Sequence, residues 1–240
     1  MDNLDNIVND PLIEQKAIDD HLSIIHATRC IMVRYLLPQG EIILDLGGGH
    51  SPLYNMGYAY RFKRLYIIDL PLERRQFYKE IVINTECELG EVMIRYSDMT
   101  NLAGIEDSSV DFVWSGQSIE HVSEDLGICM CNEVFRVLRR GGSFCLDTPN
   151  RLITQIHTHS VGGGFVHPEH LIEYYPQQLM TILKNTGFII DKALGLCEMS
   201  RTLLTGEFHY SDFVFGRRFT NEVYNGYIQY YHCKNHELQN

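Results

Sequence analysis

Histidine and glutamate gather in two short segments of this chain. One is Glu120-His121, and the other is His167-Pro168-Glu169-His170. An imidazole titrates near neutral pH, so it is suited to removing a proton from a hydroxyl group. Imidazole nitrogens and a carboxylate oxygen are also suitable ligands for a divalent metal ion. These residue types therefore indicate acid–base chemistry or a metal site, provided that the fold brings the two segments together.

A second set of residues lies at the ends of predicted strands. Each is the last residue of an apolar segment with the composition of a buried strand, or follows such a segment directly. The set is Asp45, Gly47, Gly48, Gly49, Asp69, Leu70, Asp98, Met99, Ser115 and Gln117. Glycines after a strand let the backbone approach a ligand closely. An acid about twenty residues further on typically accepts hydrogen bonds from ribose hydroxyls. The ordered set therefore predicts a ribose-containing ligand at the ends of these strands.

Strands and helices alternate along the chain at short spacing. The predicted strands cover 41–46, 65–70, 92–98, 110–115, 141–149, 188–194 and 226–233, and the predicted helices cover 12–37, 58–62, 71–82, 124–139 and 176–187. The strands are apolar on both faces, which is typical of a parallel sheet covered by helices on both sides. We predict an α/β fold with a doubly wound, mostly parallel seven-stranded sheet that binds its ligand at the carboxyl ends of the strands.

No repeat, low-complexity segment or linker divides the 240 residues, so we expect a single domain. It would comprise an N-terminal helical segment (1–40), a core (41–195), a cap (196–225) and a last strand (226–233). The cap is rich in rings and arginines: Arg201, Phe208, Tyr210, Phe213, Phe215, Arg217, Arg218 and Phe219. These side chains are suited to stacking on a ring and pairing with a phosphate, and a plain helical cover is the other interpretation. His157 and His159 precede a glycine-rich loop (161–165) that could move as a lid.

Composition excludes several kinds of partner. Lys and Arg total 20 against 31 Asp and Glu, and this net charge of −11 argues against coating nucleic acid or an anionic membrane. The seven cysteines are odd in number and scattered, which fits reduced thiols. The polar N-terminus is unlike a signal peptide, and no apolar run reaches the ~18 residues of a membrane helix. We expect a cytoplasmic protein with no nucleic-acid or membrane partner, and leave a homodimer open.

The strand-end motifs together resemble those of the class I S-adenosylmethionine-dependent methyltransferases. The motifs are DLGGGHSP, LYIIDLP, RYSDMTNL, VDFVWSGQSIEHV and VFRVLRRGGSFCLDTPN, within residues 41–194. The competing reading, a nicotinamide-binding enzyme, requires a third glycine where this chain has Pro52. The resemblance implies S-adenosylmethionine as cofactor. It also implies roles at four places: Gly47 and Gly49 under the methionine part, Asp69 at the ribose, Asp98 and Met99 beside the adenine, and Ser115 and Gln117 near the reacting methyl group.

The segment TPN followed by HPEHLIEYYPQQL also resembles a subgroup that includes small-RNA 3′-end methyltransferases and is related to quinone-biosynthesis O-methyltransferases. Some members bind a divalent ion through E-x-x-E-H and a later histidine. Here Gln117 replaces the first glutamate, which removes one anionic ligand. We therefore expect a metal-independent enzyme in which His121, His167 or His170 is the catalytic base and Glu120 orients it.

A longer pattern, which adds GLCEMSRTL and YIQYYHC, resembles methyltransferases of bacterial surface-polysaccharide pathways. This resemblance implies O-methylation of a small hydroxylated carbohydrate, either a sugar or a nucleotide-linked sugar. The alternatives are methylation of an RNA 3′ end or a quinone precursor, and a cofactor-binding protein without catalysis.

Overall fold

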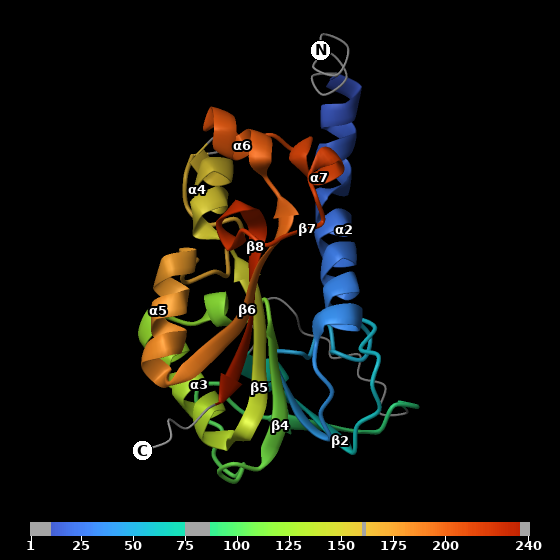
Figure 1. The fold of residues 1–240 in the computed structure, drawn as a ribbon, viewed down its shortest axis with the longest axis vertical. Coiled ribbons are helices and arrows are strands. Elements are labelled where there is room, and N and C mark those ends of the chain that lie inside the picture. The colour runs from blue at the N-terminus through green and yellow to red at the C-terminus, as the bar shows by residue number, and fades with distance from the viewer. Residues whose placement is uncertain (1–10, 75–86, 160–161, 236–240) are drawn as a thin grey trace.

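A mixed sheet runs through the centre of the computed structural model, which describes residues 11–74, 87–159 and 162–235 (Figure 1). The sheet order is β3-β2-β1-β4-β5-β8-β6-β7. The strands are β1 (Ile42–Leu46), β2 (Arg64–Asp69), β3 (Glu91–Tyr96), β4 (Val110–Gly116), β5 (Leu138–Pro149), β6 (Phe188–Glu198), β7 (Phe219–Thr220) and β8 (Gly226–Asn235). The five strands from β3 to β5 pair in parallel, and β8 pairs antiparallel with both β5 and β6. The predicted Rossmann-like α/β fold is confirmed.

All seven predicted strands are present, and the described sheet has one more. The additional strand, β7, is two residues long and pairs antiparallel with Gly195 and Leu196 of β6. It lies inside the segment predicted as a cap, where the sequence Phe219-Thr220 is too short to carry a periodic signal.

The helices predicted at 12–37, 124–139 and 176–187 are present, and the helix at Arg151–His159 was not predicted. The α-helices are α2 (Pro11–Leu36), α3 (Glu124–Val137), α4 (Arg151–His159), α5 (Pro176–Thr186), α6 (Ser200–Thr205) and α7 (Asp212–Phe215), and the 3₁₀ turns are η1 (Leu72–Arg74), η2 (Ile119–His121) and η3 (Val223–Asn225). The helix predicted from 71 begins as η1, and its remainder lies outside the described residues.

The helix predicted at 58–62 is wrong, because this segment is an irregular loop. Tyr58 and Phe62 are both buried. The Tyr58 hydroxyl donates to the Pro38 carbonyl at 2.8 Å, and the Phe62 amide donates to the Leu89 carbonyl at 3.0 Å. These contacts with distant parts of the chain replace the local hydrogen bonds that a helix would make.

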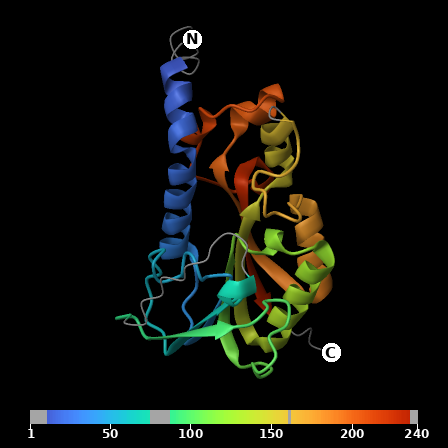
Figure 2. The ribbon, with the colours of Figure 1, turned by 180° about the vertical axis from the view of Figure 1, so that it is seen from behind.

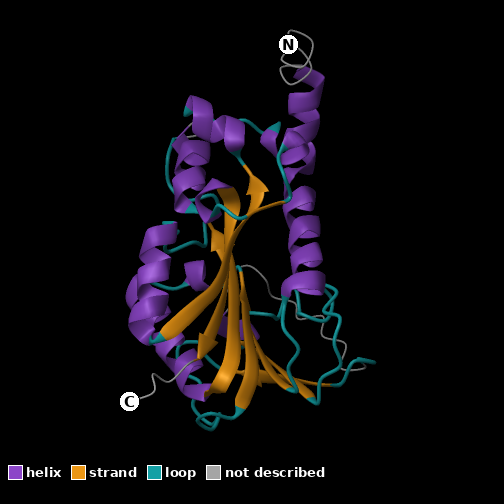
Figure 3. Ribbon diagram, viewed as in Figure 1, coloured by secondary structure: helices purple, strands orange, loops and turns teal. Residues whose placement is uncertain are grey.

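Two apolar cores lie on the two faces of the sheet. Along β4, Phe112 and Trp114 enter one core, whereas Val113 enters the other, as the two-residue period of a strand requires. Helices α3 and α5 cover the second core (Figure 3), and α2 contributes Met32 and Val33 to the first. Strands covered on both faces explain the apolar runs in the sequence.

Helix α2 extends past the end of the sheet to reach the segment that holds α6 and α7 (Figures 1 and 2). The Glu14 carboxylate accepts hydrogen bonds from the amides of Tyr210 and Ser211, and these bonds hold α2 against the segment with α6 and α7.

Among the described helices, α2 included, none is long and apolar enough to cross a membrane. The position of α2 makes it one wall of the space above the strand ends.

Candidate active site

A cavity of about 890 Å³ opens at the carboxyl ends of the parallel strands. Its lining comes from the segments after β1, β2, β3, β4 and β5, from α2, and from the loop 166–171. Ligand pockets typically occupy ~300–1,000 Å³, so this cavity is near the upper end of the range. It is large enough for a cofactor and a second molecule side by side.

The glycine turn after β1 packs closely against the side chains of Ser118 and Asp45. Gly47 has φ +73°, and a Cβ atom there would collide with the Ser118 hydroxyl. A Cβ atom on Gly48 would collide with the Asp45 carboxylate, which accepts the Leu53 amide at 2.7 Å. Burial raises the pKa of Asp45 to about 7. Only glycine fits these two positions, and their backbone lines the cavity.

Asp69 ties the glycine turn to the end of β2. Its carboxylate accepts the Gly49 amide at 2.8 Å and the Leu70 amide at 2.7 Å. Asp69 itself lines the cavity, as do Asp98 and Met99 after β3. Asp69, which is predicted to bind the ribose, is therefore held in place by the glycine turn, which is predicted to lie under the same ligand.

Most of the predicted site residues line this one cavity. They are Asp45, Gly47, Gly48, Asp69, Leu70, Asp98, Met99, Gln117, Glu120, His121, His167 and His170. Gly49 and Ser115 are not among the lining residues. Ser115 is fully buried, since the period of β4 directs it to the same side as Val113, away from Trp114. The structure therefore does not support a contact between the Ser115 side chain and the reacting methyl group.

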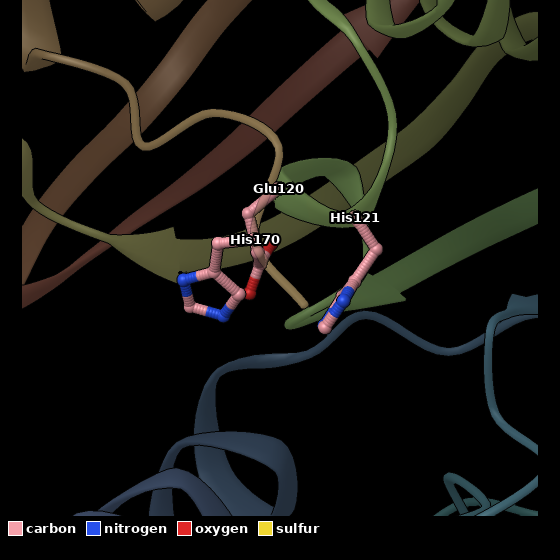
Figure 4. A group of neighbouring side chains, drawn as sticks. All are labelled: Glu120, His121 and His170. Atoms are coloured by element: carbon pink, nitrogen blue, oxygen red, sulfur yellow. The ribbon is translucent and has the colours of Figure 1, made fainter. Parts of the chain in front are cut away.

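The two histidine segments meet at one side of the cavity. The ring centroids of His121 and His170 are 5.0 Å apart, and His167 lies 5.4 Å from His170. The Leu171 amide donates to the Glu120 carbonyl at 2.9 Å, which holds the loop against η2. Figure 4 shows Glu120 and His121 projecting from η2 and His170 from the facing loop.

Glu120 and His121 are both shifted toward their neutral forms. Glu120 is fully buried, and burial raises the pKa of its carboxyl group to about 7. One of its oxygens accepts the Thr148 hydroxyl at 2.9 Å, and the other, Oε1, has no partner among the described residues. Burial, followed by the charge of His170, lowers the pKa of His121 to about 4. His121 is therefore a neutral imidazole at pH 7.

A carboxylate without an assigned role in the sequence analysis, Glu173, orients His170. The Glu173 Oε1 atom lies 2.8 Å from the His170 Nδ1 atom, and the Thr154 hydroxyl and Val166 amide donate to the same carboxylate. Burial acts to raise the pKa of Glu173, but the hydrogen bonds from His170 and Thr154 outweigh it and lower the pKa. Glu173 therefore stays ionised.

That Glu120 orients the base stays a prediction, and the carboxylate hydrogen-bonded to His170 is that of Glu173. Glu173 does appear in the pattern H-x-x-H-x-x-E, formed by His167, His170 and Glu173. The spacing alone could not show that its side chain is buried beneath the histidine rather than exposed on the loop.

A buried ion pair that the sequence did not predict lies at the floor of the cavity. The Arg29 Nε atom of α2 is 2.6 Å from the Asp147 Oδ2 atom at the end of β5. Asp147 also accepts the backbone amide of Gln117, which has the left-handed φ of +53°. The two residues are 118 positions apart in the sequence, so no local sequence pattern predicts their contact.

The segment predicted as a cap supports the cavity wall without lining it. His157 of α4 lies between the hydroxyls of Tyr210 and Tyr227, at 2.8 Å from each, and stacks on Phe208 at 3.9 Å. Of these four residues, His157 and Tyr227 line the cavity, whereas none of the three cap arginines does. The structure favours a cover over a direct ligand platform. The predicted lid at 161–165 begins outside the described residues.

Three side chains offer a divalent cation a partial set of ligands. One ligand atom each from Glu120, His121 and His170 lies within 4.8 Å of the others. The unpartnered Glu120 oxygen and the neutral His121 ring suit a metal, and Glu173 behind His170 matches the carboxylate that commonly supports a ligating histidine. With one carboxylate among the three ligands, the site could hold a metal only with additional ligands such as water or substrate oxygens.

Comparison with known proteins agrees with this geometry. Residues 44–146 match the sequence profile of a family described as "Methyltransferase domain". A protein of Mycolicibacterium smegmatis named "Probable S-adenosylmethionine-dependent methyltransferase" is 34% identical over 116 residues, which are 48% of this chain and 42% of that protein. The chain therefore matches less than half of that relative's length.

Solved structures show the same fold over nearly the whole chain. A S-adenosylmethionine-dependent methyltransferase of Thermotoga maritima aligns with a TM-score of 0.60 and 16% identity, covering 93% of this chain and 98% of its own. The small RNA methyltransferase HEN1 aligns with a TM-score of 0.61 and 16% identity, covering 88% of this chain and 25% of its own. A S-adenosylmethionine-dependent methyltransferase of Archaeoglobus fulgidus aligns with a TM-score of 0.58 and 14% identity, covering 89% of this chain and 93% of its own.

The fold is the one that solved S-adenosylmethionine-dependent methyltransferases have, and in this chain a cavity opens at its strand ends. Residues 44–146, less than half of the chain, resemble a methyltransferase domain, and the matching relative is named for its dependence on S-adenosylmethionine.

Proposed function

We propose that this protein transfers a methyl group from S-adenosylmethionine to a hydroxyl oxygen of a small carbohydrate, either a sugar or a nucleotide-linked sugar. The observation that carries the proposal is the His170–Glu173 pair, which shares one cavity with the glycine turn and Asp69. A histidine held by a buried carboxylate is an arrangement suited to removing a proton from a hydroxyl.

S-adenosylmethionine supplies the methyl group from its sulfonium centre. His170 accepts the hydroxyl proton at Nε2, because its Nδ1 atom is 2.8 Å from Glu173. The ionised Glu173 stabilises the imidazolium that forms. His121 remains neutral beside it and is suited to hydrogen-bonding the acceptor. The enzyme's main contribution is to align the hydroxyl with the methyl group.

The charge of the cavity favours a neutral acceptor over RNA. Five lining residues are acidic, namely Asp45, Asp69, Asp98, Glu120 and Glu169, whereas the lining arginines are Arg29 and Arg74. HEN1 acts on small RNA by its name, but a polyanion requires surplus cations, which the described residues of this lining do not provide. The resemblance to enzymes of surface-polysaccharide pathways supports a sugar as the acceptor.

The test is turnover of wild type and His170→Ala on a panel of sugars and nucleotide-linked sugars. We expect methylation of an oxygen by wild type and a kcat lower by roughly 10²–10⁴-fold in the variant. His159→Ala is the matched control, because His159 is exposed and does not line the cavity. Unchanged turnover in His170→Ala would remove His170 as the base, and binding of S-adenosylmethionine without turnover on any acceptor would favour a non-catalytic protein.

A second candidate is metal-assisted methylation, which the ligand atoms of Glu120, His121 and His170 favour. A divalent cation there would act as a Lewis acid toward an acceptor oxygen. The one negative charge of the set favours the metal-free reaction, so EDTA-treated protein is expected to retain most of its activity. A loss that Mn²⁺ or Mg²⁺ restores would establish the second candidate and indicate a vicinal diol as acceptor.

A further inference from the structure

The cavity extends from the strand ends along α2, which continues past the end of the sheet (Figure 1). Arg29 of this helix contacts Asp147 at the end of β5. His21 also lines the cavity, and it lies about 12 Å from Arg29 along the helix axis. The outer part of the cavity, on the side of His21, is lined by His21, Leu22, Ile25, His26, His157, Val166, Tyr227 and Ile228. None of these residues belongs to the set expected to bind the cofactor.

The described lining of this outer part carries no acid, lysine or arginine. Four of its side chains are apolar, namely Leu22, Ile25, Val166 and Ile228, and three of the four belong to or pack against one core cluster. Both arginines that line the cavity pair with acids outside this part. Because a diphosphate needs cationic partners, the outer part suits an uncharged ligand with an apolar group.

His157 is a fixed and uncharged part of this wall. One ring nitrogen lies 2.8 Å from the Tyr227 hydroxyl, and the other lies 2.8 Å from the Tyr210 hydroxyl. The ring stacks on Phe208, and burial lowers the pKa of His157 to about 4. A ligand therefore meets a neutral ring here whose nitrogens already have partners.

His21 offers the outer part a hydrogen-bond acceptor. Its Nδ1 atom lies 2.6 Å from the Ile18 carbonyl, and a carbonyl can only accept, so Nδ1 carries the hydrogen. In the neutral ring Nε2 is then an acceptor, and no described residue donates to it. Nε2 is also absent from the buried polar atoms that lack a partner, so it is accessible. The ring packs against Tyr210 and Phe213, which hold it in place.

Helix α4 connects the outer part to the proposed base. The Thr154 hydroxyl donates to Glu173, the carboxylate that holds His170, and His157 lies about one turn further along the same helix. The Val166 amide donates to Glu173 as well. The outer part therefore lies next to the site at which the acceptor hydroxyl would lose its proton.

We propose that the outer part of the cavity binds the non-reacting part of the acceptor, and that the acceptor is an uncharged glycoside with an apolar group. The apolar group lies against Leu22, Ile25 and Val166, and a hydroxyl of the glycoside donates to His21 Nε2. This inference rests on the proposed function and chooses the sugar over the nucleotide-linked sugar. It also gives α2 and α4 a role in selecting the acceptor.

The experiment titrates three forms of each sugar in a panel of hexoses into protein saturated with S-adenosylhomocysteine: the free sugar, its phenyl glycoside and its uridine diphosphate ester. For the hexose that binds best, the phenyl glycoside is expected to bind about 10- to 100-fold more tightly than the free sugar, since the phenyl ring leaves water. The diphosphate ester should bind no more tightly than the free sugar. Tighter binding of the diphosphate ester than of the phenyl glycoside would overturn the inference.

Leu22→Ser tests the apolar wall, because Leu22 is 69% exposed and its replacement should leave the fold intact. The preference for the phenyl glycoside should fall by about 3- to 10-fold, with the affinity for S-adenosylhomocysteine unchanged. Leu204→Ser is the matched control, because Leu204 is 87% exposed and does not line the cavity. Equal preferences in these two variants would overturn the role of the wall.

His21→Phe keeps a ring against Tyr210 and Phe213 and removes the Nε2 acceptor. The KM for the methylated glycoside should rise by about 5- to 10-fold while kcat changes little, because the lost hydrogen bond is remote from the reacting atoms. An unchanged KM would overturn the role of His21. If the diphosphate ester alone is methylated, the inference fails and the proposed function stands. If no form is bound or methylated, the proposed function fails and this inference fails with it.

Discussion

Three buried carboxylates lie in or next to the cavity wall, and their surroundings differ. Glu173 is held by a histidine, Asp147 by an arginine, and one oxygen of Glu120 has no partner among the described residues. Burial raises the pKa of Glu120, whereas the hydrogen bonds from His170 and Thr154 lower the pKa of Glu173. At the scale of single residues, the chemistry of the site depends on which acid lies beside which base.

Glu173→Gln tests whether the carboxylate positions the base. The amide preserves the size of the side chain but not its charge, so kcat should fall by roughly 10- to 100-fold. The affinity for S-adenosylhomocysteine should be unchanged, because Glu173 does not line the cavity. Stopped-time assays measure kcat, and calorimetry on the same preparation measures the affinity for S-adenosylhomocysteine. Glu207→Gln, at an exposed glutamate, is the control, and equal kcat values in the two variants would contradict this role.

Glu120 makes stability depend on pH in a predictable direction. Burial raises its pKa to about 7 from the ordinary value of 4.5. Between these values the folded protein retains a proton that the unfolded chain has released, so the stability from this group is present below about pH 4.5 and is lost as the pH rises through about 7. Glu120→Gln removes this dependence.

Urea unfolding of wild type and Glu120→Gln between about pH 4.5 and 7, in EDTA, checks this expectation. The free energy of unfolding of the variant should rise relative to wild type by on the order of 1 kcal/mol per pH unit. Both proteins keep the histidines whose pKa burial lowers to about 4, His121, His157 and His232, so the difference between the proteins isolates Glu120. A difference that does not vary with pH would show that Glu120 is ionised throughout.

At the scale of elements, Asn150 connects three parts of the fold through its buried side chain. Its side-chain nitrogen lies 3.1 Å from the Tyr224 carbonyl and 2.8 Å from the Gly226 carbonyl, and its oxygen accepts the Leu152 amide at the start of α4. One buried side chain thus fixes the end of β5 relative to η3, β8 and α4.

Asn150→Ala should lower the free energy of unfolding by about 2 kcal/mol, since buried carbonyls lose a donor and α4 loses the hydrogen bond at its first turn. Thermal or urea unfolding measures the change. Asn185→Ala, at an exposed position of α5, should change stability little. Equal stability of the two variants would show that neighbouring groups replace the lost hydrogen bonds.

The elements themselves were largely predictable, because apolar runs of strand length alternate with helical spacing. The seven predicted strands appear within a few residues of their expected bounds. The loop at 58–62 and the strand β7 were not predictable, since contacts with residues such as Pro38, Leu89 and Gly195 determine them. Local spacing carries no information about such distant contacts.

The same distinction applies to the site. Asp45, Asp69 and His170 follow strands or lie in short motifs, so the sequence predicted them, and the fold brings them to one cavity. The ion pair of Arg29 with Asp147 could not be predicted, because it depends on how α2 packs against the sheet. Glu173 belongs to the pattern H-x-x-H-x-x-E in the sequence, but only the structure shows that its carboxylate contacts His170.

At the scale of the whole molecule, residues from the strand ends, from α2 and from the loop before α5 line one cavity. The strand ends contribute the glycine turn and the acids, η2 and the loop contribute the histidines, and α2 contributes Arg29. Under the proposed function, cofactor and acceptor bind in this one space, as direct methyl transfer requires.

Calorimetric titration of S-adenosylhomocysteine into wild type and Asp69→Ala tests the central claim most directly. The account predicts saturable binding by wild type and affinity weaker by roughly tenfold in Asp69→Ala, because the ribose hydroxyls lose their charged acceptor. Asp191→Ala, at an exposed aspartate of β6, should bind like wild type. Absence of binding by wild type, or equal affinity in Asp69→Ala and wild type, would contradict the account.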